Sequence, residues 1–275
     1  MMADATTNPV ENRIAIVTGG GRGLGRAMVL GLARAGIHVI ATAARERAEV
    51  EAIAKDVRRV CGESRVLPLV ADVTQDSDCA RVVDVAMERF GRLDILINNA
   101  GRGMKYVSDR FMSEPTRFWE VAPETWRMVI DTNVNGPFLM ARQAVPVMHN
   151  AGWGRIVNVS MSQETMRRRG FSPYGPSKAA LESETIIWAQ DLAGTGITVN
   201  ALLPGGATLT GMIPDTVSEA ARSRLLDPSI MVPPLLWLVS PEADGFTGRR
   251  LVAAKWKAGS DGRSAAEAAT EQAGW

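Results

Sequence analysis

The chain has 275 residues, of which 46% are hydrophobic, and a formal net charge of +1. This length suits one large α/β domain or two small ones, and the apolar content is sufficient for a substantial core. A net charge near zero gives no global basic field for nucleic acid or an anionic membrane, so neither is an expected partner.

No secretion signal or membrane span is visible in the sequence. Residues 1–12 are polar, and no apolar run approaches the about 18 residues that a transmembrane helix needs. Cys61 and Cys79 have no CxxC partner, and the only histidines are His38 and His149. We therefore expect ordinary thiols, no metal site and a cytoplasmic location.

A β-branched run at residues 13–18 (RIAIVT) ends in a glycine cluster, and residues 26–33 then show helical spacing. Strand, glycine turn and helix in succession predict the first half of a βαβ nucleotide-binding unit. Glycines let the backbone approach a pyrophosphate, which the helix N-terminus stabilises. The strict GxGxxG spacing is absent, so a purely structural turn remains an alternative.

The second predicted strand, residues 37–42 (IHVIAT), runs into Ala43, Ala44 and Arg45. A site that selects NAD usually has a carboxylate there to hold the ribose 2′-hydroxyl. No acid stands at that place, whereas Arg22 in the glycine turn and Arg45 are suited to a 2′-phosphate. We therefore predict NADP in preference to NAD, with solvated arginines as the alternative.

Apolar strand patterns then alternate with helical patterns, at residues 46–60, 65–70, 77–90 and 93–97. This alternation predicts a parallel sheet covered on both faces, whose ligands bind at the carboxyl ends of the strands. Gly19, Asp72 and residues 98–101 (NNAG) all follow strand ends. Asp72 is expected to accept a hydrogen bond from an adenine amino group, with a cap of the next helix through Thr74 as the alternative.

Residues 102–121 carry aromatic side chains among charges without a clear period, which predicts an inserted loop at the mouth of the site. Residues 124–148 are helical but interrupted near Asn133. Asparagine is mildly unfavourable inside a helix. We therefore expect Asn133 to mark a helix distortion that frees a backbone carbonyl to hold water.

After a strand at residues 154–160 (GRIVNVS), a predicted helix at residues 174–192 begins with Tyr174 and has Lys178 four positions on. Residues i and i+4 lie on one face of a helix. An ammonium beside a phenol lowers the phenol pKa from about 10 towards neutral, which gives a usable general acid/base. Taken alone, such a pair is more often a helix-start tyrosine with a solvated lysine.

The remaining pattern predicts strands at residues 196–203 and 246–253 and a mobile, proline-containing segment at residues 209–234. We place a single domain at residues 12–255, after an N-terminal tail at residues 1–11. Residues 256–275 are small and polar, which predicts a flexible C-terminal tail or a partner arm.

Over about residues 12–253 the chain resembles the short-chain dehydrogenase/reductase family. The motifs, in order, are residues 18–25 (TGGGRGLG), Asp72-Val73, residues 98–101, Asn133, a strand-end serine, residues 174–178 (YGPSK) and Pro204-Gly205. The resemblance implies a Rossmann-like doubly wound α/β fold of about seven strands. It also implies hydride transfer between a nicotinamide and a secondary alcohol/ketone pair, in a homotetramer or homodimer.

The same resemblance implies roles for individual residues. Tyr174 exchanges a proton with the substrate oxygen, Lys178 depresses the Tyr174 pKa and binds the nicotinamide ribose, and Asn133 supports a proton-relay water. The implied NADP(H) site, with NAD(H) as the alternative, comprises Gly19, Arg22, Gly23, Leu24, Gly25, Arg45, Asp72, Val73, Asn99, Ala100, Gly101, Tyr174, Lys178, Pro204, Gly205 and Thr208.

The sequence departs from the family at the serine that would hydrogen-bond the substrate oxygen. The place thirteen residues before Tyr174, where relatives commonly have this serine, is Met161, flanked by Ser160 and Ser162. Alternate strand residues face the same side, so the two serines share one face. Ser162 lies further towards the tyrosine helix and is our prediction, with Ser160 as the alternative.

Two other functions remain open. A regulatory protein that binds the cofactor without turnover would retain the same fold, and an epimerase would run another reaction on it. The presence of Tyr174, Lys178 and Asn133 together favours an oxidoreductase over a regulatory protein.

Overall fold

The computed structural model describes residues 10–274. Within that range one sheet of eight strands has the order β3-β2-β1-β4-β5-β6-β7-β8, and only the β7–β8 pairing is antiparallel. The strands are β1 Ile14–Val17, β2 His38–Ala43, β3 Val66–Val70, β4 Ile95–Asn98, β5 Gly154–Val159, β6 Ile197–Leu203, β7 Arg250–Val252 and β8 Thr270–Glu271. The predicted parallel α/β sheet is confirmed, with one strand more than expected.

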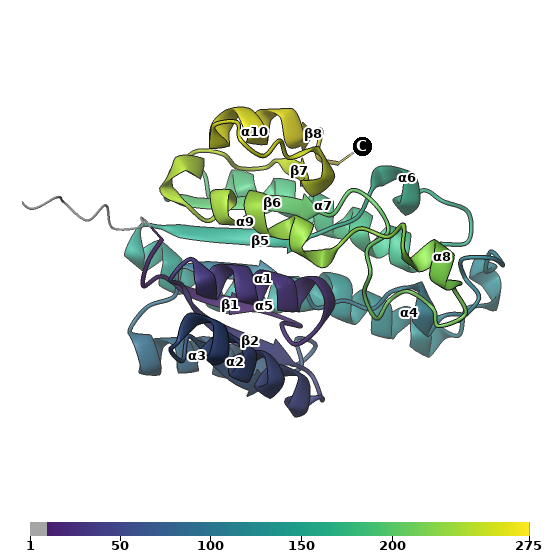
Figure 1. The fold of residues 1–275 in the computed structure, drawn as a ribbon, viewed down its shortest axis with the longest axis horizontal. Helices are drawn as coiled ribbons and strands as arrows, with labels where there is room; N and C mark the ends of the chain where they lie inside the picture. The colour runs from purple at the N-terminus through teal and green to yellow at the C-terminus, as the bar shows by residue number, and fades with distance from the viewer. Residues whose placement is uncertain (1–9, 275) are drawn as a thin grey trace, which may run out of the picture.

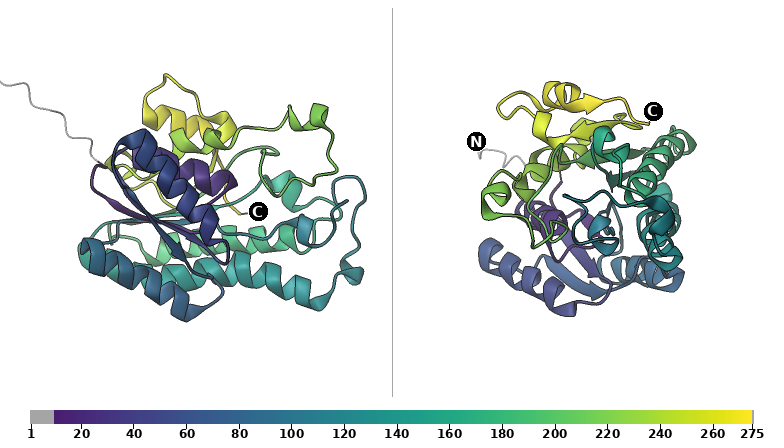
Figure 2. Two further views of the ribbon diagram at one scale, coloured as in Figure 1. Left: turned by 60° about the horizontal axis from the view of Figure 1, so that its bottom comes forward. Right: turned by 90° about the vertical axis from the view of Figure 1, so that its right-hand side faces the viewer.

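Helices cover both faces of this sheet, as Figure 1 and the left view of Figure 2 show. They are α1 Gly23–Arg34, α2 Arg47–Cys61, α3 Asp76–Phe90, α4 Pro123–Ile130, α5 Gly136–Ala151, α6 Gln163–Met166, α7 Tyr174–Asp191, α8 Glu219–Arg222, α9 Val232–Leu238 and α10 Gly262–Ala269. The strand order reverses between β1 and β4, and in open α/β sheets such a switch point is where ligands bind.

Alternate residues of each strand enter opposite apolar cores. Ala15 and Val17 of β1 pack in the core that contains residues of α1, α2 and α9. Ile14 and Ile16 pack in the other core, with residues of α3 and α5. Side chains of successive strand residues point to opposite faces, which explains why the strand reads as a continuous apolar run.

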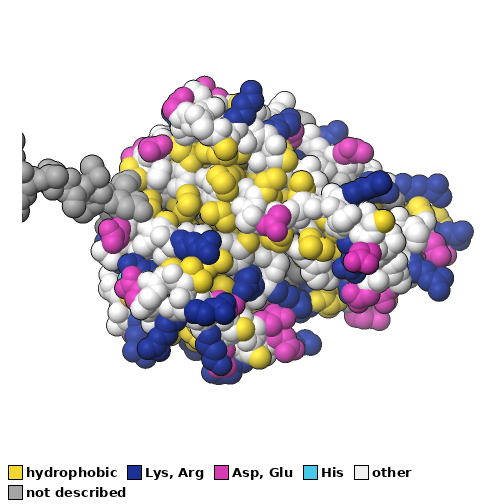
Figure 3. Space-filling view, viewed as in Figure 1, with side chains coloured by type: hydrophobic (Ala, Val, Ile, Leu, Met, Phe, Trp, Pro, Cys, Tyr) yellow, Lys and Arg dark blue, Asp and Glu magenta, His cyan; other side chains and the backbone are white. Residues whose placement is uncertain are grey.

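The parallel strands all present their carboxyl ends at one end of the molecule, to the right in Figure 1, where α4, α6 and α8 also lie. The right view of Figure 2 looks onto this end. Lys, Arg, Asp and Glu side chains are interspersed on the face shown in Figure 3, in keeping with the net charge of +1. Across residues 10–274, no helix combines the length and apolar character needed to cross a bilayer.

The predicted interruption of the helix around Asn133 is confirmed. α4 and α5 are joined by a π-helical turn at Asp131–Asn135, so the helical hydrogen-bond pattern changes at this residue. Such π-bulges are uncommon and are frequently found at functional sites.

The C-terminal segment differs from its prediction as a flexible tail. Residues 262–271 form α10 and β8, and β8 extends the sheet by pairing with β7. Ala265, Ala266 and Ala269 are buried, so small side chains let α10 approach the core closely although they carry little apolar area. Residues 1–9 of the predicted N-terminal tail lie outside the described residues.

Candidate active site

The turn after β1 is tied to the end of β4. Thr18 Oγ1 accepts hydrogen bonds from the backbone N–H groups of Asn99 and Ala100, both at 3.0 Å. Asn99 Nδ2 in turn donates to the carbonyl oxygens of Thr18 at 2.8 Å and Gly19 at 3.0 Å. A Cβ on Gly25 would overlap the Gly19 carbonyl oxygen, so this close turn requires glycine at position 25.

The N-terminus of α1 fits the pyrophosphate of a dinucleotide. The helix begins at Gly23, and its N-cap residue, Arg22, makes no side-chain capping hydrogen bond. No acidic residue lies in the first turn. The first N–H groups of a helix have no intrahelical partner, and the helix dipole favours an anion beside them.

Both arginines predicted to hold a 2′-phosphate are exposed near this end of the sheet. Arg22 Nη1 lies 3.3 Å from Glu49 Oε1 in a surface ion pair. Such pairs contribute at most about 1 kcal/mol, so an incoming phosphate could replace Glu49 as the partner of Arg22. The structure thus provides the arginines but also places one carboxylate beside them, and the choice of NADP stays a prediction.

Asp72 forms a local turn after β3. Its Oδ1 accepts from the backbone N–H of Thr74 at 3.0 Å and from the Thr74 hydroxyl at 2.9 Å. This Asx turn precedes α3, whose N-cap residue is Gln75. Val73 packs against α5, where a Cβ on Gly136 would lie 2.7 Å from Val73 Cγ2. These contacts test neither the predicted adenine contact of Asp72 nor the place of Val73 in the cofactor site.

Asn133 connects the π-helical turn to the helix that carries Tyr174. Its Oδ1 accepts from the N–H of Arg102 at 2.7 Å, and its Nδ2 donates to the Arg102 carbonyl and to Ser177 Oγ, both at 2.9 Å. Ser177 donates to the Tyr174 carbonyl oxygen at 2.7 Å. Both ends of the Asn133 amide are thus bound to protein, and the role of its backbone carbonyl in holding a relay water stays a prediction.

Lys178 is buried one helical turn after Tyr174, beside the end of β5. Its Nζ donates to the Val159 carbonyl oxygen at 2.7 Å, and a Cβ on Gly101 would lie 3.9 Å from it. Burial lowers the pKa of Lys178 to about 8, while the Glu182 carboxylate acts in the opposite direction. Burial also raises the pKa of Tyr174 to about 12. Tyr174 is therefore a protonated phenol near neutral pH. The predicted lowering of its pKa by Lys178 is wrong for this arrangement, because burial of the phenol decides the direction of the shift.

The two candidate serines have different partners. Ser160 is buried and donates to Glu182 Oε1 at 2.6 Å. Ser162 is half-buried and caps α6, with its Oγ 2.7 Å from Thr165 Oγ1 and 3.3 Å from the Thr165 N–H nitrogen. No hydrogen bond within residues 10–274 joins either hydroxyl to Tyr174, so the catalytic serine stays a prediction.

Met161 contributes to the apolar surroundings of Tyr174. It belongs to a small buried cluster, against which Tyr174 packs, formed by Met104, Met161, Met166 and Phe171. Phe111 of the inserted loop stacks edge-on against Phe171, with ring centroids 5.8 Å apart. The position that holds a serine in many relatives is therefore occupied here by a thioether side chain.

A family model described as short chain dehydrogenase matches residues 13–221. The chain belongs to the short-chain dehydrogenase/reductase family. It is 36% identical over 213 residues to a short-chain type dehydrogenase/reductase of Picea abies, covering 76% of this chain and 75% of that protein. It is 30% identical over 247 residues to the 3-oxoacyl-(acyl-carrier-protein) reductase FabG of Thermotoga maritima, covering 87% and 95%.

Solved structures of the family have the same fold. The 3-ketoacyl-(acyl-carrier-protein) reductase of Brucella melitensis, in complex with NADH, matches with a TM-score of 0.77 at 30% identity, covering 88% of this chain and 97% of that one. A candidate NAD(P)-dependent gluconate 5-dehydrogenase of Beutenbergia cavernae, with NADP at low occupancy, gives a TM-score of 0.77 at 29% identity, covering 90% and 97%. This short-chain dehydrogenase/reductase is thus an oxidoreductase of the family, and a nicotinamide dinucleotide is supported as its cofactor.

The loop after β6 approaches both parts of the site in this family member. A Cβ on Gly23 would lie 3.2 Å from Thr210, and one on Gly103 would lie 3.2 Å from Met212 Sδ. Lys105 forms an ion pair with Asp215 at 3.2 Å. The predicted cofactor residues of this loop lie at its start, at Pro204, Gly205 and Thr208.

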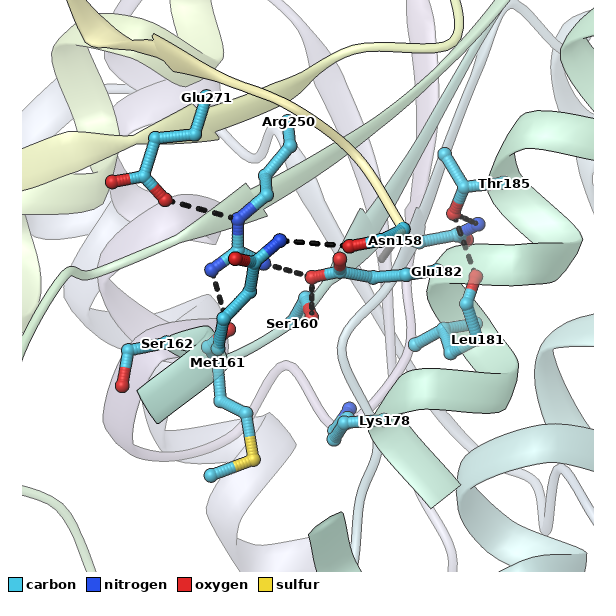
Figure 4. Close-up of polar contacts among 12 residues, drawn as sticks. Asn158, Ser160, Met161, Ser162, Lys178, Leu181, Glu182, Thr185, Arg250 and Glu271 are labelled. Carbon is cyan, nitrogen blue, oxygen red and sulfur yellow. Dashed lines mark hydrogen bonds and ion pairs between the residues drawn. The ribbon is translucent and has the colours of Figure 1, made fainter. Parts of the chain in front are cut away.

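Sequence reasoning missed a line of buried polar groups from β4 to α7. Asn98 Nδ2 donates to Asn158 Oδ1 at 2.9 Å, and Asn158 Nδ2 donates to Thr185 Oγ1 at 2.9 Å. Thr185 then donates to the Leu181 carbonyl at 2.8 Å (Figure 4). Asn158, between the apolar residues Val157 and Val159 of β5, was the signal, because a buried amide requires partners.

Proposed function

We propose that the protein is an NADP(H)-preferring oxidoreductase that interconverts a secondary alcohol and a ketone. The observation that supports this most is the arrangement around Gly101, where a Cβ would lie 3.3 Å from Asn133 Oδ1 and 3.9 Å from Lys178 Nζ. Tyr174 is on the same helix as Lys178, and the glycine turn fits a pyrophosphate at the same edge of the sheet. A bound nicotinamide supplies or accepts the hydride.

Tyr174 is the proposed general acid in ketone reduction. Its raised pKa of about 12 keeps the proton on the phenol until a substrate oxygen accepts it. Lys178, one turn away and with a pKa of about 8, would hold the ribose hydroxyls as an ammonium near neutral pH. The Asn133 carbonyl would hold the water through which Tyr174 is reprotonated.

Ser162 is the proposed donor to the substrate oxygen. The Ser160 hydroxyl is committed to the Glu182 carboxylate inside the protein, and such charge-assisted bonds are roughly twice as strong as neutral ones. The Ser162 hydroxyl has only the hydroxyl and N–H of Thr165 as partners and lies on a half-buried residue. Replacing the hydrogen bonds between Ser162 and Thr165 by one to a substrate therefore costs less than breaking the bond between Ser160 and Glu182.

The apolar cluster around Tyr174 supports a substrate whose carbonyl carbon carries an apolar group. Methionine side chains are flexible and adapt to irregular shapes, so Met104, Met161 and Met166 suit several substituents. The proposal includes a homotetramer or homodimer, for which Phe138 of α5 and Ile187 of α7 are exposed apolar residues.

The test is a panel of ketones and alcohols followed at the nicotinamide absorbance, with wild type and Tyr174→Phe. We expect stoichiometric NADPH consumption with a ketone. Loss of general acid catalysis in Tyr174→Phe should lower kcat by about 10²–10⁴-fold. The variant should bind NADPH with a Kd within about twofold of wild type, since the phenol oxygen is not a phosphate ligand. Cofactor binding without turnover would identify the regulatory alternative, and substrate conversion without net cofactor change would identify an epimerase.

The same assay with both cofactors tests the preference. We expect a lower KM for NADPH than for NADH, and a higher KM for NADPH in Arg22→Ala and in Arg45→Ala. A 2′-phosphate contact with an arginine contributes about 1–3 kcal/mol, or about 5- to 150-fold in KM. Glu49→Gln is the matched comparison, because it leaves Arg22 in place and removes its competing carboxylate. Equal use of both cofactors by wild type would contradict the NADP preference.

A further inference from the structure

A buried charge cluster lies directly behind the segment between β5 and α6, and the proposed chemistry does not use it. Arg250 of β7 and Glu182 of α7 form an ion pair in which both side chains are at most 2% exposed. Arg250 Nη2 also donates to the Met161 carbonyl oxygen at 2.9 Å, and Glu182 accepts the Ser160 hydroxyl at 2.6 Å (Figure 4). Glu271 of β8 is the outer partner, with its Oε2 3.2 Å from Arg250 Nε.

Fold stability is a poor explanation for this cluster. Removing two charges from water costs several kcal/mol per ion, and replacing a buried pair by apolar residues of similar volume is often neutral or stabilising. The other hydrogen bonds of Arg250 and Glu182 indicate the role of the pair more directly. Both members of the pair bind the short stretch at Ser160 and Met161, which directly precedes the proposed Ser162.

The end of β5 and the two residues after it each form a hydrogen bond to a buried charged side chain. The Val159 carbonyl accepts from Lys178, and Ser160 and Met161 bind the ion pair. Beyond Ser162, Gln163 Nε2 donates to the carbonyl oxygens of Gln272 at 3.1 Å and Gly274 at 2.8 Å. Residues after β8 therefore hold Gln163, which directly follows the segment that Arg250 holds.

We propose that Arg250 is a positioning residue of the active site, which acts with Glu182 to fix Ser160–Met161–Ser162 relative to Tyr174 and Lys178. Through its ion pair with Arg250, Glu271 links this arrangement to the last strand, β8. The inference rests on the proposed function. Its physical basis is that a displacement of about 1 Å at a reacting group can cost about 100-fold in rate.

The contacts explain how a side chain that touches no reacting atom acts on the site. The guanidinium has a planar set of donors, which lets Arg250 bind two carboxylates and a carbonyl in fixed directions. Its bond to the Met161 carbonyl fixes the backbone from which the Met161 side chain extends into the cluster beside Tyr174. Its bond to Glu182 holds the carboxylate that accepts the Ser160 hydroxyl. The Ser160 hydroxyl is therefore turned to Glu182, whereas Ser162 stands at the start of α6.

The decisive comparison uses wild type, Arg250→Met and the double variant Glu182→Leu/Arg250→Met. Arg250→Met leaves a buried carboxylate unpaired, so both Tm and turnover should fall. The double variant removes both charges and should recover the wild-type Tm to within a few degrees. We expect its kcat to stay at least about 30-fold below wild type while its NADPH Kd stays within about twofold, since the displaced segment is not at the glycine turn. A double variant with wild-type Tm and wild-type kcat overturns the inference.

A second pair of variants covers the case in which the double variant does not fold. Glu271→Gln removes only the outer charge, and we expect kcat to fall about threefold or more at nearly unchanged Tm. Glu267→Gln is the control, because Glu267 on α10 is exposed and pairs only weakly with Arg263, at 3.9 Å. Equal kcat for Glu271→Gln, Glu267→Gln and wild type would then overturn the inference. Absence of turnover by wild type with every ketone overturns the proposed function instead, and this inference with it.

Discussion

The two halves of the sheet differ in whether charged side chains are buried within their strands. In the half formed by β1, β2, β3 and β4, no Lys, Arg, Asp or Glu lies within a strand, and Thr18 and Asn99 bind mainly backbone groups at the strand ends. In the half formed by β5, β6, β7 and β8, Arg155 and Arg250 are fully buried within strands and depend on carboxylates from elsewhere in the chain.

The presence of buried charges in only one half of the sheet corresponds to a difference in what the two halves bind. Under the proposed function, the first half presents backbone groups and a helix N-terminus to the cofactor, for which small residues at fixed spacing are sufficient. The second half then has to hold side chains and a strand-end segment for the substrate. Buried charges fix geometry at an energetic cost, which is acceptable where position determines the rate.

Gly25→Ala is the largest expected perturbation of the first half. Its Cβ would overlap the Gly19 carbonyl oxygen and lie 2.6 Å from Asn99 Nδ2, so the turn must open. We expect the NADPH Kd, measured by fluorescence titration, to rise about 1000-fold, or about 4 kcal/mol. Gly62→Ala is the control, because Gly62 ends α2 with a φ of 77° and no atom within 4 Å of its Cβ position. It should lose about 1 kcal/mol of stability and keep its cofactor affinity. A folded Gly25→Ala with normal affinity would contradict the proposed cofactor site.

The first half could be predicted from the sequence because its signals are local. Strand, glycine turn and helix follow one another within residues 13–34, and the NNAG motif follows its own strand. The second half depends on pairs far apart in the chain, such as Arg250 with Met161. Arg250 lies in a predicted strand, but nothing local indicated that it is buried or that Glu182 is its partner. The C-terminal helix escaped prediction because its buried face consists of alanines.

Ser162→Ala compared with Ser160→Ala tests which residue of the second half contacts substrate. Removing a donor to the substrate oxygen should lower kcat about 100-fold in Ser162→Ala. Loss of the α6 cap should lower its stability by only about 1 kcal/mol. Ser160→Ala should lose about 1–2 kcal/mol of stability, because Glu182 loses a hydrogen bond, with a smaller effect on kcat. Steady-state kinetics and thermal unfolding of both variants give the ranking, and the reverse order in kcat would assign the role to Ser160.

The smallest expected effect is a pH dependence of stability that comes from Glu184, one of two carboxylates on α7 with opposite environments. Glu182 is paired with Arg250, whereas Glu184 Oε2 is buried without a hydrogen-bond partner among residues 10–274. Burial raises the pKa of Glu184 from 4.5 to about 7. Between these values the folded state holds more protons than the unfolded state, so stability falls as pH rises through this window. The contribution of the protonated carboxyl is complete below pH 4.5 and is lost above pH 7.

Glu184→Gln cannot ionise, so its stability should not fall through this window. At pH 8 we expect it to exceed wild type by about 1–2 kcal/mol in denaturant unfolding, a value reduced because the side chain is partly exposed. At pH 4.5 the two proteins should differ little. The same substitution at position 182 should destabilise by about 3 kcal/mol at pH 8, because it leaves Arg250 without its buried counter-charge. If both substitutions shifted stability in the same direction at pH 8, the buried charges of α7 would not differ in the way their contacts indicate.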